Sequence, residues 1–121
     1  MRWLLHGPMT KAVGEAVVRH GHQVRDLVHV KLPPEATAGE VLKVARAEQL
    51  EVMTTDAHLV AAVFEGQIPF SRTMVFLQLA GGEVEQDDAV DRLFARYKRL
   101  SPQRLYTLTE TRVKVRQLPG G

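Results

Sequence analysis

The chain has 121 residues, the usual size of one domain with a modest hydrophobic core. Apolar residues make up 45% of the chain and charged residues 25%, as in an ordinary soluble protein. The absence of cysteine excludes disulfides, a thiolate nucleophile and thiolate metal ligands. No apolar run approaches the roughly 18 residues of a membrane span, and the apolar start is too short for a signal peptide. We therefore expect a single cytoplasmic domain without a membrane partner.

Basic residues are concentrated toward the C-terminal end of the chain. The net charge is only +2, yet eight of the sixteen lysines and arginines lie between Arg92 and Arg116. Glu110 is the one acidic residue in that stretch. A basic surface formed by one segment indicates a polyanionic partner more strongly than the small net charge does.

Apolar residues recur along the chain with the periods of strands and helices in turn. In chain order, the expected elements are a strand at 2–6, a helix at 9–20, a strand at 23–30, a helix at 37–48, a strand at 50–55, a helix at 56–64, a strand at 73–79, a helix at 87–100 and two strands at 105–109 and 112–117. In the last two strands, apolar and polar residues alternate with period two, as in a C-terminal β-hairpin. Alternating strands and helices indicate a mainly parallel sheet with helices on both faces, which is a three-layer α/β/α sandwich.

Particular residues mark where some of these elements begin and end. Gly21 follows the first helix, at the position of a helix stop. Thr37 and Glu40 have the spacing of a capping box at the start of the second helix. Gly66–Pro69 is expected to be a loop, and Gly81–Gly82 is expected to end the strand before it.

Four segments, in this order, carry recognisable motifs: Trp3-Leu-Leu-His-Gly-Pro-Met, His20-Gly-His-Gln-Val24, Thr37-Ala-Gly-Glu-Val-Leu42 and Val52-Met-Thr-Thr-Asp-Ala-His-Leu59. Together they resemble the PIN-like superfamily, in particular a short bacterial branch described only as a domain of unknown function. The resemblance covers roughly residues 1–80, and the last forty residues resemble the end of longer members. It implies a PIN-like α/β fold and a ribonuclease chemistry in which carboxylates hold Mg²⁺ or Mn²⁺.

The chain departs from that family's acidic pattern at several positions. The first strand should end in Asp but ends in His6, and the helix start should present Asp but presents Ala38, with Glu40 one turn further on. Asp56 keeps the acid of the Thr-x-Asp motif, and His58 replaces the next acid. The resemblance therefore implies Asp56 and Glu40 as catalytic acids. Because hard cations need oxygen ligands, so few carboxylates imply weak Mg²⁺ binding.

Ligands of parallel sheets bind beyond the carboxyl ends of the strands, so we expect His6, Asp56 and the helix start at Thr37 to gather at one edge. In one interpretation, His6, His58 and Asp56 form a metal site of two histidines and one carboxylate, which suits Mn, Fe or Zn. In the other interpretation, no metal is bound. His6 is then a buried, hydrogen-bonded imidazole, Asp56 is a helix N-cap, and Glu40 is the capping-box partner of Thr37.

The last strand carries a row of cations. Side chains alternate along a strand, so Arg112, Lys114 and Arg116 share one face, about 6.5 Å apart, close to the spacing of successive phosphates. Val113 and Val115 are expected to point to the core. The alternative role of such charges is to prevent edge-to-edge aggregation of an exposed strand.

The helix before this hairpin extends the expected nucleic-acid surface. Arg96 and Arg99 on that helix would widen the cationic patch, and Tyr97 and Tyr106 would offer stacking surfaces for bases. RNA is the expected partner, and DNA is an alternative. A solvated helix face also carries charges, so the arginines alone do not establish nucleic-acid binding.

Three functional hypotheses follow from these features. The first is a PIN-like, RNA-directed domain whose nuclease site is weak or inactive. The second is an active Mg²⁺- or Mn²⁺-dependent ribonuclease of the toxin–antitoxin type that uses Asp56 and Glu40. The third is a protein-interaction module, which forms a homodimer or binds an antitoxin-like protein through an exposed Ile68–Phe70 segment.

Overall fold

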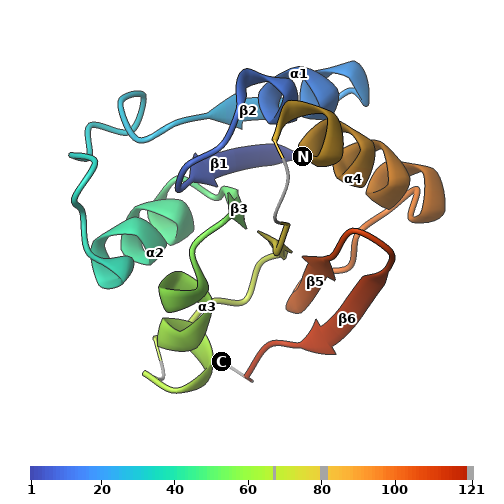
Figure 1. Cartoon of the computed structure of the whole chain (residues 1–121). Helices are drawn as coiled ribbons and strands as arrows, with labels where there is room; N and C mark the ends of the chain where they lie inside the picture. The colour runs from blue at the N-terminus through green and yellow to red at the C-terminus, as the bar shows by residue number, and fades with distance from the viewer. Residues whose placement is uncertain (67, 80–81, 120–121) are drawn as a thin grey trace.

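The strands form one mostly parallel sheet in a mixed α/β fold (Figure 1). The structure is a computed structural model that describes residues 1–66, 68–79 and 82–119; Gln67 of the expected loop and Gly81 of the expected break lie outside the described residues. The elements of the described chain are β1 (Arg2–His6), α1 (Lys11–Arg19), β2 (Gln23–Arg25), α2 (Ala38–Ala47), β3 (Glu51–Thr54), α3 (Ala57–Phe64), β4 (Met74–Leu77), α4 (Glu83–Arg96), β5 (Arg104–Leu108) and β6 (Val113–Gln117).

The strand order is β2-β1-β3-β4-β5-β6. Strands β1 to β5 run parallel, and β6 pairs antiparallel with β5, as predicted for the C-terminal hairpin. The chain leaves β1 toward β2 on one side and then returns to the other side of β1 as β3. The carboxyl ends of β1 and β3 meet at this switch point, with His6 in register with Thr54. Ligands of doubly wound sheets bind at such a switch point.

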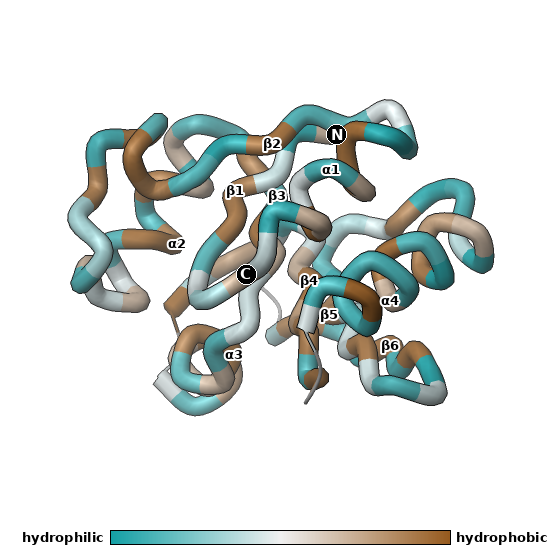
Figure 2. The backbone as a smooth tube through the Cα atoms, turned by 45° about the horizontal axis from the view of Figure 1, so that its top comes forward, coloured by the Kyte–Doolittle hydropathy of each residue, from teal (hydrophilic) through white to brown (hydrophobic). Residues whose placement is uncertain are grey.

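Two hydrophobic clusters lie on opposite faces of the sheet. Successive strand residues point to opposite faces, so Trp3 joins the first cluster and Leu4 the second. Helices α1 and α4 contribute Val17 and Leu93 to the first cluster, and α2 contributes Val41 to the second. Figure 2 shows hydrophilic and hydrophobic residues alternating along α4, as expected of a helix with one buried face. None of the described helices is long and apolar enough to cross a membrane.

The second strand is shorter than predicted. The prediction of a strand at 23–30 is wrong from Asp26 onward, because side chains there bond to the backbone in turns. Asp26 Oδ1 accepts the N–H of His29 at 3.0 Å, and His29 Nδ1 accepts the N–H of Asp26 at 3.1 Å. Such local bonds give the backbone an alternative to a strand ladder.

Helix α4 begins and ends earlier than the predicted helix at 87–100. Glu85 Oε2 accepts the N–H of Gly82 at 3.0 Å, which satisfies a donor at the helix start that would otherwise lack a partner. At the other end, Tyr97 has extended backbone angles (φ −118°, ψ 99°) and stops the helix. Arg99, which was expected on this helix, therefore follows it.

Two predictions of burial are wrong. Val115 was expected in the core but is 44% exposed, and Val113 is only partly buried, because β6 is the edge strand and α1 and α4 pack on strands further inside. Phe70 was expected in an exposed segment at 68–70, yet it is 1% exposed and belongs to the second cluster. That segment therefore does not present its aromatic ring to a partner.

Candidate functional site at the carboxyl edge of the sheet

The side chain of Thr54 connects the ends of β1 and β3 at the switch point. Its Oγ1 lies 2.8 Å from Nδ1 of His6 and accepts the backbone N–H of Asp56 at 2.9 Å. The N–H of Thr55 also donates to the carbonyl oxygen of His6, at 3.2 Å. Thr54 is absent from the predicted site, although the Thr-x-Asp motif contains it. Thr54 contacts His6 of β1, a strand that is distant in the sequence, so no local pattern reveals this contact.

His6 is a buried, neutral imidazole. Its side chain is nearly inaccessible, and burial lowers its pKa below the usual value of 6.5, while the nearby charge of Asp56 raises the pKa by a smaller amount. Thr54 is fully buried, and its hydroxyl shares a hydrogen bond with Nδ1 of His6 whose direction depends on which ring nitrogen carries the proton. The geometry of His6 therefore agrees with the interpretation in which it is a buried, hydrogen-bonded imidazole.

Asp56 is the N-cap of α3, as predicted. Its Oδ1 accepts the backbone N–H of His58 at 2.8 Å, which satisfies one of the free donors at the helix start. Nδ1 of His58 lies 3.2 Å from the same oxygen, and the His58 side chain is 98% exposed. His58 therefore contacts Asp56, and the structure shows no contact between it and His6. A catalytic role for Asp56 stays a prediction.

Glu40 forms the predicted capping box with Thr37. Its carboxylate accepts the N–H of Thr37 at 2.9 Å, and the Thr37 hydroxyl accepts the N–H of Glu40 at 3.2 Å. These hydrogen bonds with Thr37 lower the pKa of Glu40. The carboxylate is exposed and bound to the start of α2, so the structure gives it a structural role. Its catalytic role also stays a prediction.

The predicted metal ligands do not gather into a donor set. Among the described residues, no group of three or more histidines and carboxylates is placed to hold a metal ion. Nδ1 of His6 bonds to Thr54, and Oδ1 of Asp56 bonds to the start of α3. In this arrangement, the donors fit a hydrogen-bonded network better than a coordination shell. Binding of Mg²⁺, Mn²⁺ or a transition metal stays a prediction.

A glycine allows the chain to pack closely at the switch point. Gly7 follows β1 with φ +89°, a left-handed conformation that glycine adopts without steric cost. A Cβ atom at this position would lie 2.3 Å from Oγ1 of Thr55. That hydroxyl oxygen is itself buried and has no hydrogen-bond partner among the described residues. The edge of the sheet at β1 and β3 is therefore tightly packed around Gly7.

The cations of the last strand form a row on one face, as predicted. Arg116 is in register with Leu105, which belongs to the second cluster, so Lys114 and Arg116 lie on the α2–α3 side of the sheet, and Arg112 directly precedes the strand. All three side chains are exposed. The guanidinium carbon of Arg116 lies 4.0 Å from the centre of the Phe64 ring, a cation–π contact that ties β6 to the end of α3. These three residues are called the cationic row below.

Arg96 and Arg99 do not join the cationic row. Helix α4 packs on the other face of the sheet through the first cluster, and the guanidinium of Arg96 lies 5.5 Å from the centre of the Tyr97 ring. Arg99 lines a separate pocket beside Met1, which precedes β1. Tyr106, expected to stack with bases, is 3% exposed and packs edge-on against Tyr97. The predicted nucleic-acid surface is thus divided between two faces.

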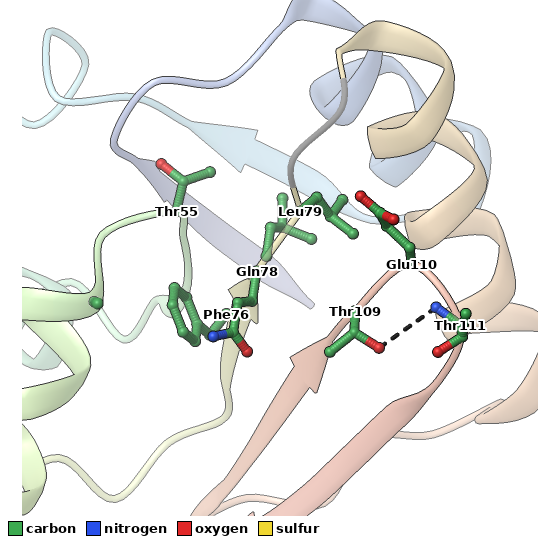
Figure 3. A pocket seen from close by; sticks show the side chains of 9 residues that line it. Thr55, Phe76, Gln78, Leu79, Thr109, Glu110 and Thr111 are labelled. Atoms are coloured by element: carbon green, nitrogen blue, oxygen red, sulfur yellow. Dashed lines mark hydrogen bonds between the residues drawn. The ribbon is translucent and has the colours of Figure 1, made fainter.

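A pocket that the sequence does not reveal lies between the switch point and the cationic row. Its volume is about 630 Å³, within the range of small-ligand sites. Its walls come from the ends of β3, β4 and β5 and from the β5–β6 turn (Figure 3). The residues that form it are Thr55, Ala57, Phe76, Leu77, Gln78, Leu79, Thr109, Glu110 and Thr111. Because these segments are separated in the sequence, no local pattern predicts the pocket.

No family model, curated protein or solved structure matches this chain. What the site can do must therefore be inferred from its own geometry and charge. The resemblance to the PIN-like superfamily stays a prediction.

Proposed function

We propose that this chain is a PIN-like, RNA-binding domain with a three-layer α/β/α architecture and a weak or inactive nuclease site. The cationic row carries the proposal. Lys114 and Arg116 are exposed on one face of an edge strand, Arg112 is exposed directly before it, and alternate strand residues are about 6.5 Å apart. A single strand of RNA that follows β6 would place successive phosphates near successive cations.

The charges around the row support a polyanionic ligand. Arg116 is held against Phe64, so part of its side-chain freedom is already lost before a phosphate binds. Glu110 is the one acidic residue between Arg92 and Arg116. When cations neutralise phosphates, the phosphates release their counterions. This release makes the free energy of binding more favourable, and the effect becomes smaller as the salt concentration rises.

The switch point supports weak catalysis at most. Asp56 is the one acid retained in its family position, and the structure uses it as a helix cap. His6 is neutral and bonded to Thr54, and Glu40 is bonded to Thr37. Phosphodiester hydrolysis by hard cations needs several carboxylate oxygens, and these side chains provide few.

Binding of a labelled single-stranded RNA, followed by fluorescence anisotropy over a series of salt concentrations, tests this function. We expect the logarithm of the association constant to fall linearly with the logarithm of the salt concentration. A double-stranded DNA of equal length, measured in parallel, shows whether RNA is preferred. The absence of binding to either nucleic acid at the lowest salt concentration would contradict the proposal.

A metal-dependent ribonuclease is the second candidate, and the position of His6 and Asp56 at the switch point favours it. Incubation of varied RNAs with Mg²⁺ or Mn²⁺ tests this candidate, with Asp56→Asn as the matched control because Asn also caps helices. Cleavage by the wild type that is lost in Asp56→Asn would support the second candidate. Equal cleavage by both proteins, or none, would exclude it.

A further inference from the structure

We propose that the pocket at the ends of β3, β4 and β5 binds one unstacked nucleobase of a single-stranded nucleic acid. This inference deepens the proposed function and rests on it, because the cationic row would bring the strand to the pocket. The pocket and the row are contiguous in the chain. Glu110 and Thr111 line the pocket, and Arg112 follows them directly.

The strand register places two lining residues of the pocket, Gln78 and Thr109, on the face of the cationic row, while Leu77 and Leu79 come from the other face. Side chains two residues apart share a face, so Gln78 lies on the side of Phe76, which packs against the second cluster. The N–H of Gln78 donates to the carbonyl oxygen of Leu108 at 2.9 Å, which sets the ends of β4 and β5 side by side. Thr109 lies four residues after Leu105, a member of the second cluster, so the alternation of side chains along β5 places it on this face too.

The side chains of the pocket suit a flat, uncharged ring. Figure 3 shows Phe76 and Gln78 at the β4 side of the pocket and Thr109 at the β5 side. An aromatic ring offers a stacking surface to every base, and an amide offers a donor and an acceptor in one plane, as the edge of a base requires. The hydroxyl of the exposed Thr111 adds a further polar group at the rim.

The charge of the pocket argues against a phosphate inside it. No lysine, arginine or histidine is among the described residues that line it, and the guanidinium of Arg92 beside it already donates to the carbonyl oxygens of Thr109 and Glu110. The base would therefore enter the pocket, while the attached phosphate stays outside and contacts the cationic row.

The turn between β5 and β6 fixes the distance between these two contacts. The hydroxyl oxygen of Thr109 accepts the N–H of Arg112 at 3.1 Å and the hydroxyl donates to the carbonyl oxygen of Arg112 at 3.2 Å. Thr109 therefore holds the first cation of the row beside the pocket. One nucleotide would span the two positions, with its base against Phe76 and Gln78 and its phosphate at Arg112.

Titration of the whole, isotope-labelled chain with adenosine, cytidine and uridine, followed by NMR, tests the pocket. These nucleosides are uncharged, so their binding does not depend on the cationic row. We expect saturable shifts of the Gln78 and Thr111 amides, and none with ribose alone. Gln78→Ala is expected to raise the Kd about fivefold, which corresponds to the loss of one neutral hydrogen bond. Phe76→Leu is expected to raise it further by removing the stacking surface.

Gln23→Ala is the matched control, because Gln23 is also exposed but lies on β2 at the opposite edge of the sheet. It should leave the Kd unchanged. The absence of nucleoside shifts at the pocket would overturn the inference, and so would equal binding by Gln78→Ala, Phe76→Leu and the wild type. If RNA still binds with salt dependence in that case, the proposed function stands and only the base pocket fails. Nucleoside binding without any RNA binding would mean that the pocket binds bases but that the proposed RNA-binding function fails.

Discussion

His6 and Thr54 are joined side chain to side chain, with Nδ1 of the imidazole 2.8 Å from Oγ1 of the threonine. The two residues end the neighbouring parallel strands β1 and β3 and are in register. Thr54 also accepts the N–H of Asp56, so one buried hydroxyl joins a histidine, a strand end and a helix cap. The switch point is therefore a connected polar network within a hydrophobic sheet.

Removal of this hydroxyl should destabilise the fold. Thr54→Val keeps the shape of the side chain but leaves Nδ1 of His6 and the N–H of Asp56 without their partner. We expect a loss of about 1–3 kcal/mol in the free energy of unfolding, measured by urea denaturation. Thr107→Val on β5 is the control, because the hydroxyl of Thr107 has no hydrogen bond to a described residue. A loss of the same size in both variants would contradict the network.

The stability of the fold should fall as the pH falls below about 6.5, the ordinary pKa of histidine. Burial lowers the pKa values of both His6 and His22, so each remains neutral in the folded chain at a pH where the unfolded chain already binds a proton. The unfolded state is thus favoured by acid, and above the ordinary pKa neither group contributes a pH dependence. Urea denaturation between pH 5 and pH 7.5 measures the slope. The double variant His6→Gln, His22→Gln should flatten it, and an unchanged slope would contradict this account.

Asp56→Asn should separate the charge of Asp56 from its capping role. Asn caps helices about as well as Asp, so we expect the free energy of unfolding to stay within about 1 kcal/mol of the wild type. The negative charge of Asp56 raises the pKa of His6, so its removal should lower that pKa further. NMR titration of the His6 imidazole measures the change. Asp56→Ala removes the cap as well and should cost about 1 kcal/mol more. An unchanged His6 pKa in both variants would show that the charge of Asp56 does not affect the protonation of the imidazole ring.

Gly7→Ala should be more costly than Gly21→Ala. Both glycines have similar left-handed angles, with φ +89° and +87°. A Cβ atom on Gly21 has open space around it, whereas one on Gly7 would lie 2.3 Å from Oγ1 of Thr55. We expect about 1 kcal/mol from the backbone conformation alone at Gly21 and a larger loss at Gly7. Equal melting temperatures of the two variants would contradict the close packing at the switch point.

Local signals in the sequence predicted the residues whose partners lie nearby in the chain. The capping box of Thr37 and Glu40, the N-cap at Asp56 and the helix stop at Gly21 all depend on bonds within a few residues. The mainly parallel sheet followed from the alternation of strands and helices, and the C-terminal hairpin followed from the period-two pattern of the last two strands. The common face of the cations in the last strand followed from the period of a strand.

Features that depend on distant segments could not be predicted in this way. The bond between His6 and Thr54 joins residues far apart in the chain, and the pocket beside Gln78 is assembled from several strand ends. Val115 has the pattern of a core residue, but an edge strand leaves it exposed. Arg96 is close to the cationic row in sequence and lies on the opposite face because α4 crosses to the other side of the sheet.

The central claim is that the cationic row binds a nucleic-acid strand, and the salt dependence of RNA binding by a charge variant tests it most directly. The variant R112Q/K114Q/R116Q should lower the slope of log K against log salt by about 2, because each phosphate contact with single-stranded RNA contributes about 0.7. The control variant removes the same charge from exposed lysines elsewhere, with the substitutions K11Q, K31Q and K43Q. We predict that the row variant binds RNA roughly a hundredfold more weakly at low salt and that the control variant keeps nearly the affinity and slope of the wild type. An unchanged slope in the row variant, or an equal loss in both variants, would contradict the account.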